Sequence, residues 1–120
     1  MSATKKLGKI RDASFGLGGY HGAMLGLHVT LEGNGWRCCA TKSAWDMSLI
    51  KHSASCNWTE QERYEQYSNI MRYLSALLAA AKVQCVQKLI GIPVEAEFEN
   101  GTLKQWRVLT EVLWRASSQT

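Results

Sequence analysis

One stretch of the chain, residues 59–82, constrains the fold most strongly, because it has the features of a long amphipathic helix. Thr59 can cap the N-terminus through its hydroxyl, and Glu62, three residues later, completes a capping box. Apolar residues then recur at three- and four-residue spacing, at Tyr67, Ile70, Met71, Leu74, Leu77, Leu78 and Ala81. We therefore predict a helix over residues 59–82 with one apolar face.

The segments on both sides of this helix have the pattern of strands. Residues 24–32 alternate between apolar and more polar positions, and Asn34-Gly35 and Asn100-Gly101 favour tight hairpin turns. We predict strands at residues 7–15, 24–32, 36–45, 93–99 and 103–114, an irregular loop at 46–58 and a short helical turn within 84–90. The order β-β-β-α-β-β predicts an α+β fold, in which an antiparallel sheet of about five strands carries one long helix on one face.

Length and composition indicate one globular domain. The chain has 120 residues, of which 46% are hydrophobic and 20% are charged, so we expect a single domain over 1–120 with flexible tails at 1–6 and 116–120. The net charge of +4 permits an anionic partner without requiring one. No run of 18 apolar residues is present, and no signal peptide is evident, so we expect no membrane association and a cytoplasmic protein with reduced cysteines.

The last predicted strand is apolar on both faces, and a single helix can cover one face only. Trp106 and Val108 fall on one face, and the other face carries Leu103, Leu109 and Leu113. We expect these three leucines to form the interface of a homodimer or a higher homo-oligomer. The alternative is that the loop at residues 46–58 folds over that face.

A glycine-rich segment lies between the first two predicted strands. Gly16, Gly18, Gly19 and Gly22 fall within seven residues, and their backbone N–H groups could cradle a phosphate. The spacing matches neither a dinucleotide-binding fingerprint nor a P-loop, so the alternative is a wide, irregular hairpin loop. Tyr20 and His21 at its tip would add a stacking and hydrogen-bonding surface.

The sequence contains no recognisable catalytic or metal-binding motif. Its four cysteines form no C-x-x-C pair, and the glutamates at positions 95, 97 and 99 fit a solvated strand face. We therefore expect no metal, no cofactor and no catalytic residues, although an enzyme acting on nucleotides stays open as a third hypothesis.

Basic and aromatic residues are interspersed along the predicted strands. Proteins hold single-stranded nucleic acids and nucleotides with arginine and lysine side chains beside tryptophan on a sheet, so this pattern indicates such a surface. The alternative is that the tryptophans belong to the core. Six residues are the predicted contacts with a ligand or partner: Gly18, Gly19, Tyr20, His21, Arg37 and Arg107.

Several stretches of the chain resemble a family of small phage and prophage proteins of unassigned function. They are residues 13–20 (ASFGLGGY), 35–36, 58–59, 88–95 (KLIGIPVE) and 103–113 (LKQWRVLTEVL). The resemblance implies a phage accessory protein that acts in the bacterial cytoplasm. By analogy with other proteins of that setting, we expect a non-enzymatic protein that counters host defence, by blocking an effector such as a CRISPR–Cas protein or by sequestering a nucleotide signal. The alternative is a single-stranded nucleic-acid-binding protein of phage replication or recombination.

Overall fold

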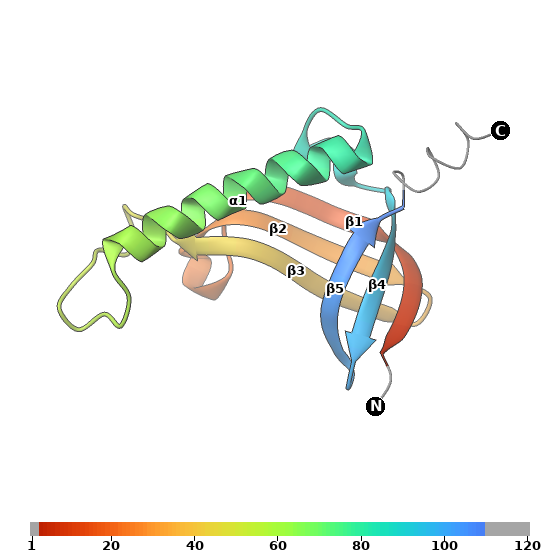
Figure 1. Ribbon diagram of the computed structural model, residues 1–120, viewed down its shortest axis with the longest axis horizontal. Coiled ribbons are helices and arrows are strands. Elements are labelled where there is room, and N and C mark those ends of the chain that lie inside the picture. The colour runs from red at the N-terminus through yellow and green to blue at the C-terminus, as the bar shows by residue number, and fades with distance from the viewer. Residues whose placement is uncertain (1–2, 110–120) are drawn as a thin grey trace.

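The computed structural model describes residues 3–109 and shows a five-stranded antiparallel sheet with one long helix (Figure 1). The elements in chain order are β1 (Thr4–Gly18), the 3₁₀ turn η1 (Tyr20–Gly22), β2 (Met24–Gly33), β3 (Trp36–Trp45), α1 (Glu60–Ala81), the 3₁₀ turn η2 (Val86–Leu89), β4 (Pro93–Glu99) and β5 (Thr102–Val108). The predicted α+β fold and element order are confirmed.

The strands follow the order β3-β2-β1-β4-β5, so β1 is the central strand. It pairs with β2 along most of its length but with β4 only from Thr4 to Lys9. The sheet curls strongly, and β5 crosses over β3 in Figure 1. Residues of both edge strands also line one hollow, so β3 and β5 approach each other across the curled sheet.

The helix forms where its local signals place it. The hydroxyl of Thr59 accepts a hydrogen bond from the Glu62 N–H (3.1 Å), and the Glu62 carboxylate accepts one from the Thr59 N–H (2.9 Å). Lys82 ends the helix in the left-handed conformation (φ 60°). α1 packs on β3 and β2 and also touches β5, burying Ile70 and Leu77.

The core lies between the inner face of the sheet, α1 and η2. Its most completely buried side chains come from β1, β2, β4 and η2, and they are Ile10, Leu27, Val29, Leu31, Leu89 and Val94. The opposite, outer face of the sheet carries alternate residues such as Arg37, Glu95 and Arg107. The alternation predicted for residues 24–32 therefore assigns the apolar positions of this strand to the inner face correctly.

The ends of β1 differ from the sequence prediction. The strand starts at Thr4, which pairs with Phe98, so residues 4–6 belong to the sheet and not to a flexible tail. It continues to Gly18, because Gly16 pairs with Gly26 and Gly18 with Met24. The predicted wide glycine loop is therefore wrong, and only a tight tip at residues 19–23 joins β1 to β2.

β5 also corrects a prediction. Phe98 pairs with Leu103 but the adjacent Glu97 pairs with Gln105, so Lys104 is the extra residue of a β-bulge. The bulge places Leu103 on the same inner face as Trp106, and both pack against the core, so the predicted opposition of Leu103 and Trp106 is wrong. Leu109 follows the strand, and residues 110–120, which include Leu113, lie outside the described part of the chain.

Candidate functional site

Four of the six predicted contact residues lie together at the tip between β1 and β2. Gly19 (φ 67°) and His21 (φ 52°) both adopt left-handed backbone conformations, which turn the chain sharply. The ring of Tyr20 lies 4.1 Å from that of His21 and 6.3 Å from that of Trp45, edge to face in both cases. The tip is thus an exposed aromatic turn, with Tyr20 68% exposed.

The glycine at position 18 has a packing role that involves His28. A methyl group on Gly18 would lie 3.1 Å from the His28 ring, so glycine leaves room for the imidazole. His28 Nε2 lies 3.2 Å from the Gly16 carbonyl oxygen and 3.3 Å from the Met24 carbonyl oxygen. The imidazole thus links the ends of β1 and β2. His28 is not among the contact residues predicted from the sequence.

The other two predicted contacts lie on opposite edge strands, far from this tip. Arg37 on β3 pairs with Glu32 (3.1 Å), and Arg107 on β5 pairs with Glu95 (3.2 Å). Arg11 also binds Glu32 (2.8 Å), and the Arg11 and Arg37 guanidinium groups hold the pKa of Glu32 below its usual value. The six predicted contact residues therefore do not form one surface.

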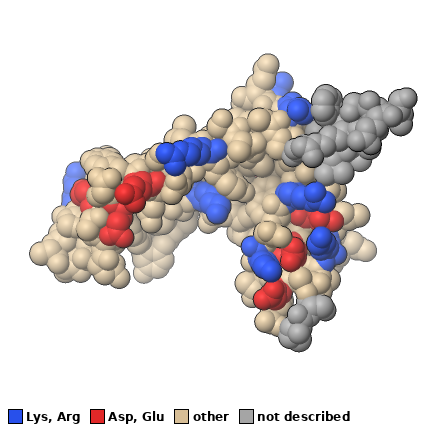
Figure 2. Space-filling view, in the orientation of Figure 1, with Lys and Arg blue, Asp and Glu red and all other residues tan. Residues whose placement is uncertain are grey.

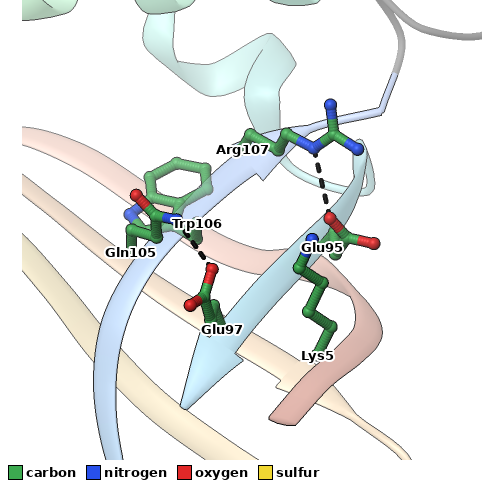
Figure 3. A pocket seen from close by; sticks show the side chains of 6 residues that line it. All are labelled: Lys5, Glu95, Glu97, Gln105, Trp106 and Arg107. Atoms are coloured by element: carbon green, nitrogen blue, oxygen red, sulfur yellow. Dashed lines mark hydrogen bonds and ion pairs between the residues drawn. The ribbon is translucent and has the colours of Figure 1, made fainter. Parts of the chain in front are cut away.

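A shallow hollow of about 360 Å³ lies on the outer face of β4 and β5 (Figure 3). Its carboxylates, Glu95 and Glu97, are bound by Arg107 (3.2 Å) and by the Gln105 amide (2.7 Å). Figure 2 shows basic and acidic side chains mixed over this end of the molecule. Because opposite charges alternate here, the outer hollow offers an anion no net attraction.

A second concave surface, which we call the inner groove, lies between the edge strands β3 and β5. It consists of two adjoining hollows of about 590 and 330 Å³ that share Leu103. Four aromatic residues from three strands and α1 contribute to its lining: Trp36, Tyr73, Phe98 and Trp106. The rings of Trp36 and Phe98 meet edge to face at 5.3 Å, and all four side chains are partly exposed.

The inner groove is also basic. Its lining contains Lys6, Lys42 and Lys104, with Arg37 at its rim, where the guanidinium pairs with Glu32 of the outer face, and none of the described lining residues is acidic. The Lys6 ammonium lies 5.5 Å from the Phe98 ring centroid, and the Lys42 ammonium lies 5.1 Å from the Tyr73 centroid. Neither of these lysines has an ion pair among residues 3–109, whereas Lys104 pairs with Glu99 (3.3 Å).

Two ionisable groups in the groove stay uncharged at neutral pH. Burial raises the pKa of the Cys38 thiol and of the Tyr73 phenol, and both groups normally ionise above pH 8. Neither group therefore adds negative charge to the groove. The arrangement combines aromatic faces with two lysines, Lys6 and Lys42, that have no ion pair among the described residues, which suits a planar, anionic ligand.

The sequence pattern indicates part of this groove but not how its residues come together. The sequence pattern predicts a surface of interspersed basic residues and tryptophans on the strands, but it places Lys6 in a tail. The groove arises because the sheet curls and because the Lys104 bulge keeps Leu103 and Trp106 on one face. Both features depend on how strands pair, which the residue pattern of a single strand does not specify.

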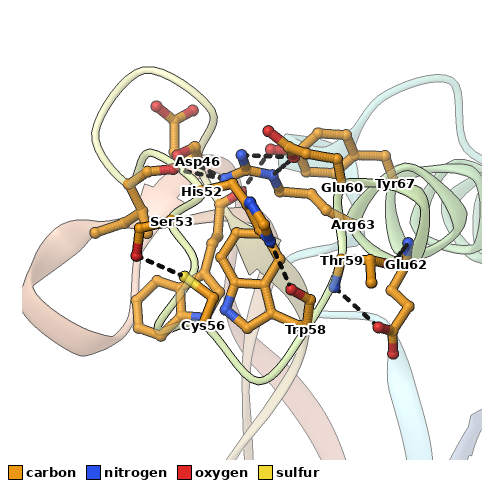
Figure 4. Close-up of polar contacts among 12 residues, drawn as sticks. Asp46, His52, Ser53, Cys56, Trp58, Thr59, Glu60, Glu62, Arg63 and Tyr67 are labelled. Atoms are coloured by element: carbon orange, nitrogen blue, oxygen red, sulfur yellow. Dashed lines mark hydrogen bonds and ion pairs between the residues drawn. The ribbon is translucent and has the colours of Figure 1, made fainter.

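A different cluster fixes the loop at residues 46–58 to the start of α1 (Figure 4). Arg63 is only 2% exposed, and it pairs with Glu60 (2.7 Å) and donates a hydrogen bond to the Ile50 carbonyl (2.7 Å). Its guanidinium also stacks 4.7 Å from the Trp58 ring centroid. These interactions are satisfied within the protein, so the cluster is a structural clamp and not an open binding site.

Neither a metal centre nor a membrane span is found in the part of the chain that the structure describes. No three His, Cys, Asp or Glu side chains converge there as ligands for an ion. No helix between residues 3 and 109 has the length and apolar character needed to cross a bilayer. In comparisons with known proteins, no family model, curated protein or solved structure matches this chain.

Proposed function

We propose that this protein binds single-stranded nucleic acid in the inner groove and that it acts by binding and not by catalysis. The observation that carries the proposal is the composition of the groove, in which four aromatic rings and two lysines without an ion pair, Lys6 and Lys42, line two adjoining hollows whose described lining residues include no carboxylate. Bases would stack on the aromatic faces, each contributing about 1–3 kcal/mol, and the lysines would attract the phosphates.

The length of the groove favours a strand over a single nucleotide. Its two hollows adjoin along β5 and offer aromatic surface in both, with Trp36 and Phe98 in the larger and Tyr73 in the smaller. Successive bases of an extended strand would occupy successive hollows. Since aromatic faces accept every base, we expect little dependence on sequence.

The resemblance to phage and prophage proteins supports a setting for this activity in the bacterial cytoplasm. There the groove would serve phage replication or recombination by holding exposed single strands. A nucleotide signal of host defence offers the same base and phosphate chemistry as a single strand. The experiment must therefore distinguish sequestration of such a nucleotide from binding of a strand.

The test is fluorescence anisotropy with a labelled oligo-dT of about 12 nucleotides between 50 and 200 mM salt. Each neutralised phosphate of a single strand contributes about −0.7 to the slope of log K against log salt, so two to four groove cations predict about −1.4 to −2.8. Competition with mononucleotides and cyclic dinucleotides, measured in parallel, shows whether a free nucleotide binds more tightly than the strand.

Paired variants localise the binding. Lys6→Gln with Lys42→Gln removes the two groove lysines that have no ion pair, and should weaken binding and reduce the magnitude of the salt slope by about 1.4. Lys5→Gln with Lys9→Gln removes the same charge from neighbouring positions of β1 that face outward, and should change both quantities far less. Equal losses in the two double variants, or no binding at 50 mM salt, would contradict the proposal.

A further inference from the structure

The second half of β1 has a free edge. On the side away from β2, β1 pairs with β4 only as far as Lys9, and Gly91 and Ile92 then bond to Ile10. Beyond Ile10, no segment of the described chain pairs with this side of β1, although β2 pairs with the other side as far as Gly18. A strand-length slot therefore lies open beside residues 11–18.

The backbone groups that point into this slot follow from the pairing pattern. The N–H and C=O of Ile10 point toward Ile92 and Gly91, and in an antiparallel strand this direction alternates from residue to residue. The bulge between Ile10 and Asp12 adds one residue, so the outward-pointing groups belong to Ala13, Phe15 and Leu17. The Asp12 carboxylate accepts a hydrogen bond from the Ala13 N–H (3.0 Å), which agrees with that N–H having no strand partner.

Most of this edge lacks the features that usually prevent strand addition. Free edges are commonly protected by lysine, proline or a bulge; the bulge at Arg11 lies at the start of this edge, and residues 13–18 contain no charged residue and no proline. The side chains of Phe15 (41% exposed) and Leu17 (55%) instead present apolar surface on the inner face beside the open backbone. Such an edge is suited to pairing with another strand.

The apolar surface continues onto α1. Gln66, Asn69 and Tyr73 line a hollow with Lys42 of β3, so they mark the helix side that faces the β3 edge. At 100° per residue, Tyr64 and Met71 lie on the opposite side, toward β1, where they are 49% and 55% exposed. With roughly 150–250 Å² for a fully exposed large side chain, the four exposed fractions amount to about 400 Å² of surface.

We propose that this edge binds a second copy of the chain, with the two β1 strands antiparallel about a twofold axis beside Phe15. In this register Phe15 pairs with Phe15 of the other copy, and Ala13 pairs with Leu17. All three residues direct their backbone groups into the slot, so the register pairs these groups of one edge with those of the other, and the Ala13 N–H would exchange the Asp12 carboxylate for a backbone carbonyl. It also places a small side chain opposite a large one and sets the two phenylalanines together as an aromatic pair.

A second copy fits this surface because the edge is complementary to itself. Residues 13–18 bring no like charges together, and the vacant slot lies beside residues 11–18, which is long enough for the same segment of a second copy to enter it. A standard interface buries about 800 Å² per partner, and the four side chains supply about half of this before the backbone is counted. We therefore expect a dimer that dissociates at about micromolar concentrations.

The test is sedimentation velocity on the full chain between about 1 and 100 µM, a range that brackets the expected dissociation constant. We expect the mass to rise with concentration toward twice the 13.4 kDa of one chain. Leu17→Lys and Phe15→Pro should both give monomers. Proline at 15 removes an N–H that points into the slot and leaves the β2 pairing intact, since Ser14 and Gly16 make those bonds.

A control and a second measurement keep the test independent of folding. Leu7→Lys changes a β1 residue that is more exposed (67%) but lies on the outer face beside β4, and it should remain dimeric. Hydrogen exchange at the Phe15 and Leu17 amides should slow as the protein concentration rises. A wild-type monomer at 100 µM, a dimer that persists in both edge variants, or dimerisation only after removal of residues 110–120 would overturn the proposal.

Discussion

At the scale of single residues, Arg63 shows what local patterning cannot reveal. The residue lies on a helix whose periodicity predicts apolar contacts on one face. From this pattern alone, an arginine on the helix is expected to be a solvent-exposed charge. In the structure it is buried, paired with Glu60, and bonded to the Ile50 carbonyl of a loop 13 residues earlier. Its role depends on where that loop returns, which no helical pattern specifies.

Replacing Arg63 should therefore be costly. Arg63→Ala leaves the Ile50 carbonyl without its donor and Glu60 without its partner, and we expect a loss of about 2–3 kcal/mol in the free energy of unfolding. Arg72→Ala is the matched control, because Arg72 is an exposed residue of the same helix whose side chain, among residues 3–109, bonds to Asn69 alone, and it should cost under about 0.5 kcal/mol. Urea titrations of both variants provide the measurement, and equal midpoints would contradict the role of the clamp.

At the scale of elements, prediction succeeds where the determining signals are close in sequence. The capping box and the apolar period fix α1 to within a residue at each end, and both Asn-Gly turns form as hairpins. It fails at the β1 tip and at β5, where the pairing register with the neighbouring strand, and not the residue pattern of one strand, decides the outcome. The glycine-rich pattern predicts Gly16 in a loop, but Gly16 pairs with Gly26 of β2 and so lies within the sheet.

This glycine pair allows a direct test of how closely β2 and β3 approach. Gly16 and Gly26 have the same φ of 159°, so conformational strain from a side chain should be similar at both. A methyl group on Gly26 would press on the Lys42 carbonyl and lie 2.6 Å from Ser43 Cα, whereas one on Gly16 would meet nothing within 4 Å. We expect Gly26→Ala to lower the free energy of unfolding by about 1–3 kcal/mol more than Gly16→Ala does. Equal losses in thermal unfolding would show that the strands can separate at no cost.

At the scale of the whole molecule, the curled sheet separates two surfaces that the sequence did not distinguish. The inner groove lies between β3 and β5, and the free edge belongs to the central strand β1 on the far side of α1. The sequence indicated an anionic ligand and a homo-oligomer, but it assigned the oligomer interface to Leu103, Leu109 and Leu113. The bulge at Lys104 turns Leu103 inward, and the open edge of β1 becomes apparent only once the short pairing with β4 is known.

Because the two surfaces share no residue, binding and dimerisation should be separable. We expect the Leu17→Lys monomer to bind a short oligonucleotide as tightly as the wild-type protein does, and the Lys6→Gln, Lys42→Gln variant to remain a dimer. An oligonucleotide long enough to reach both grooves should favour the dimer, since its second contact is intramolecular. Anisotropy with short and long oligo-dT, measured on each variant, checks this: an equal loss of affinity for both lengths in the Leu17→Lys monomer would mean that the groove itself depends on the dimer.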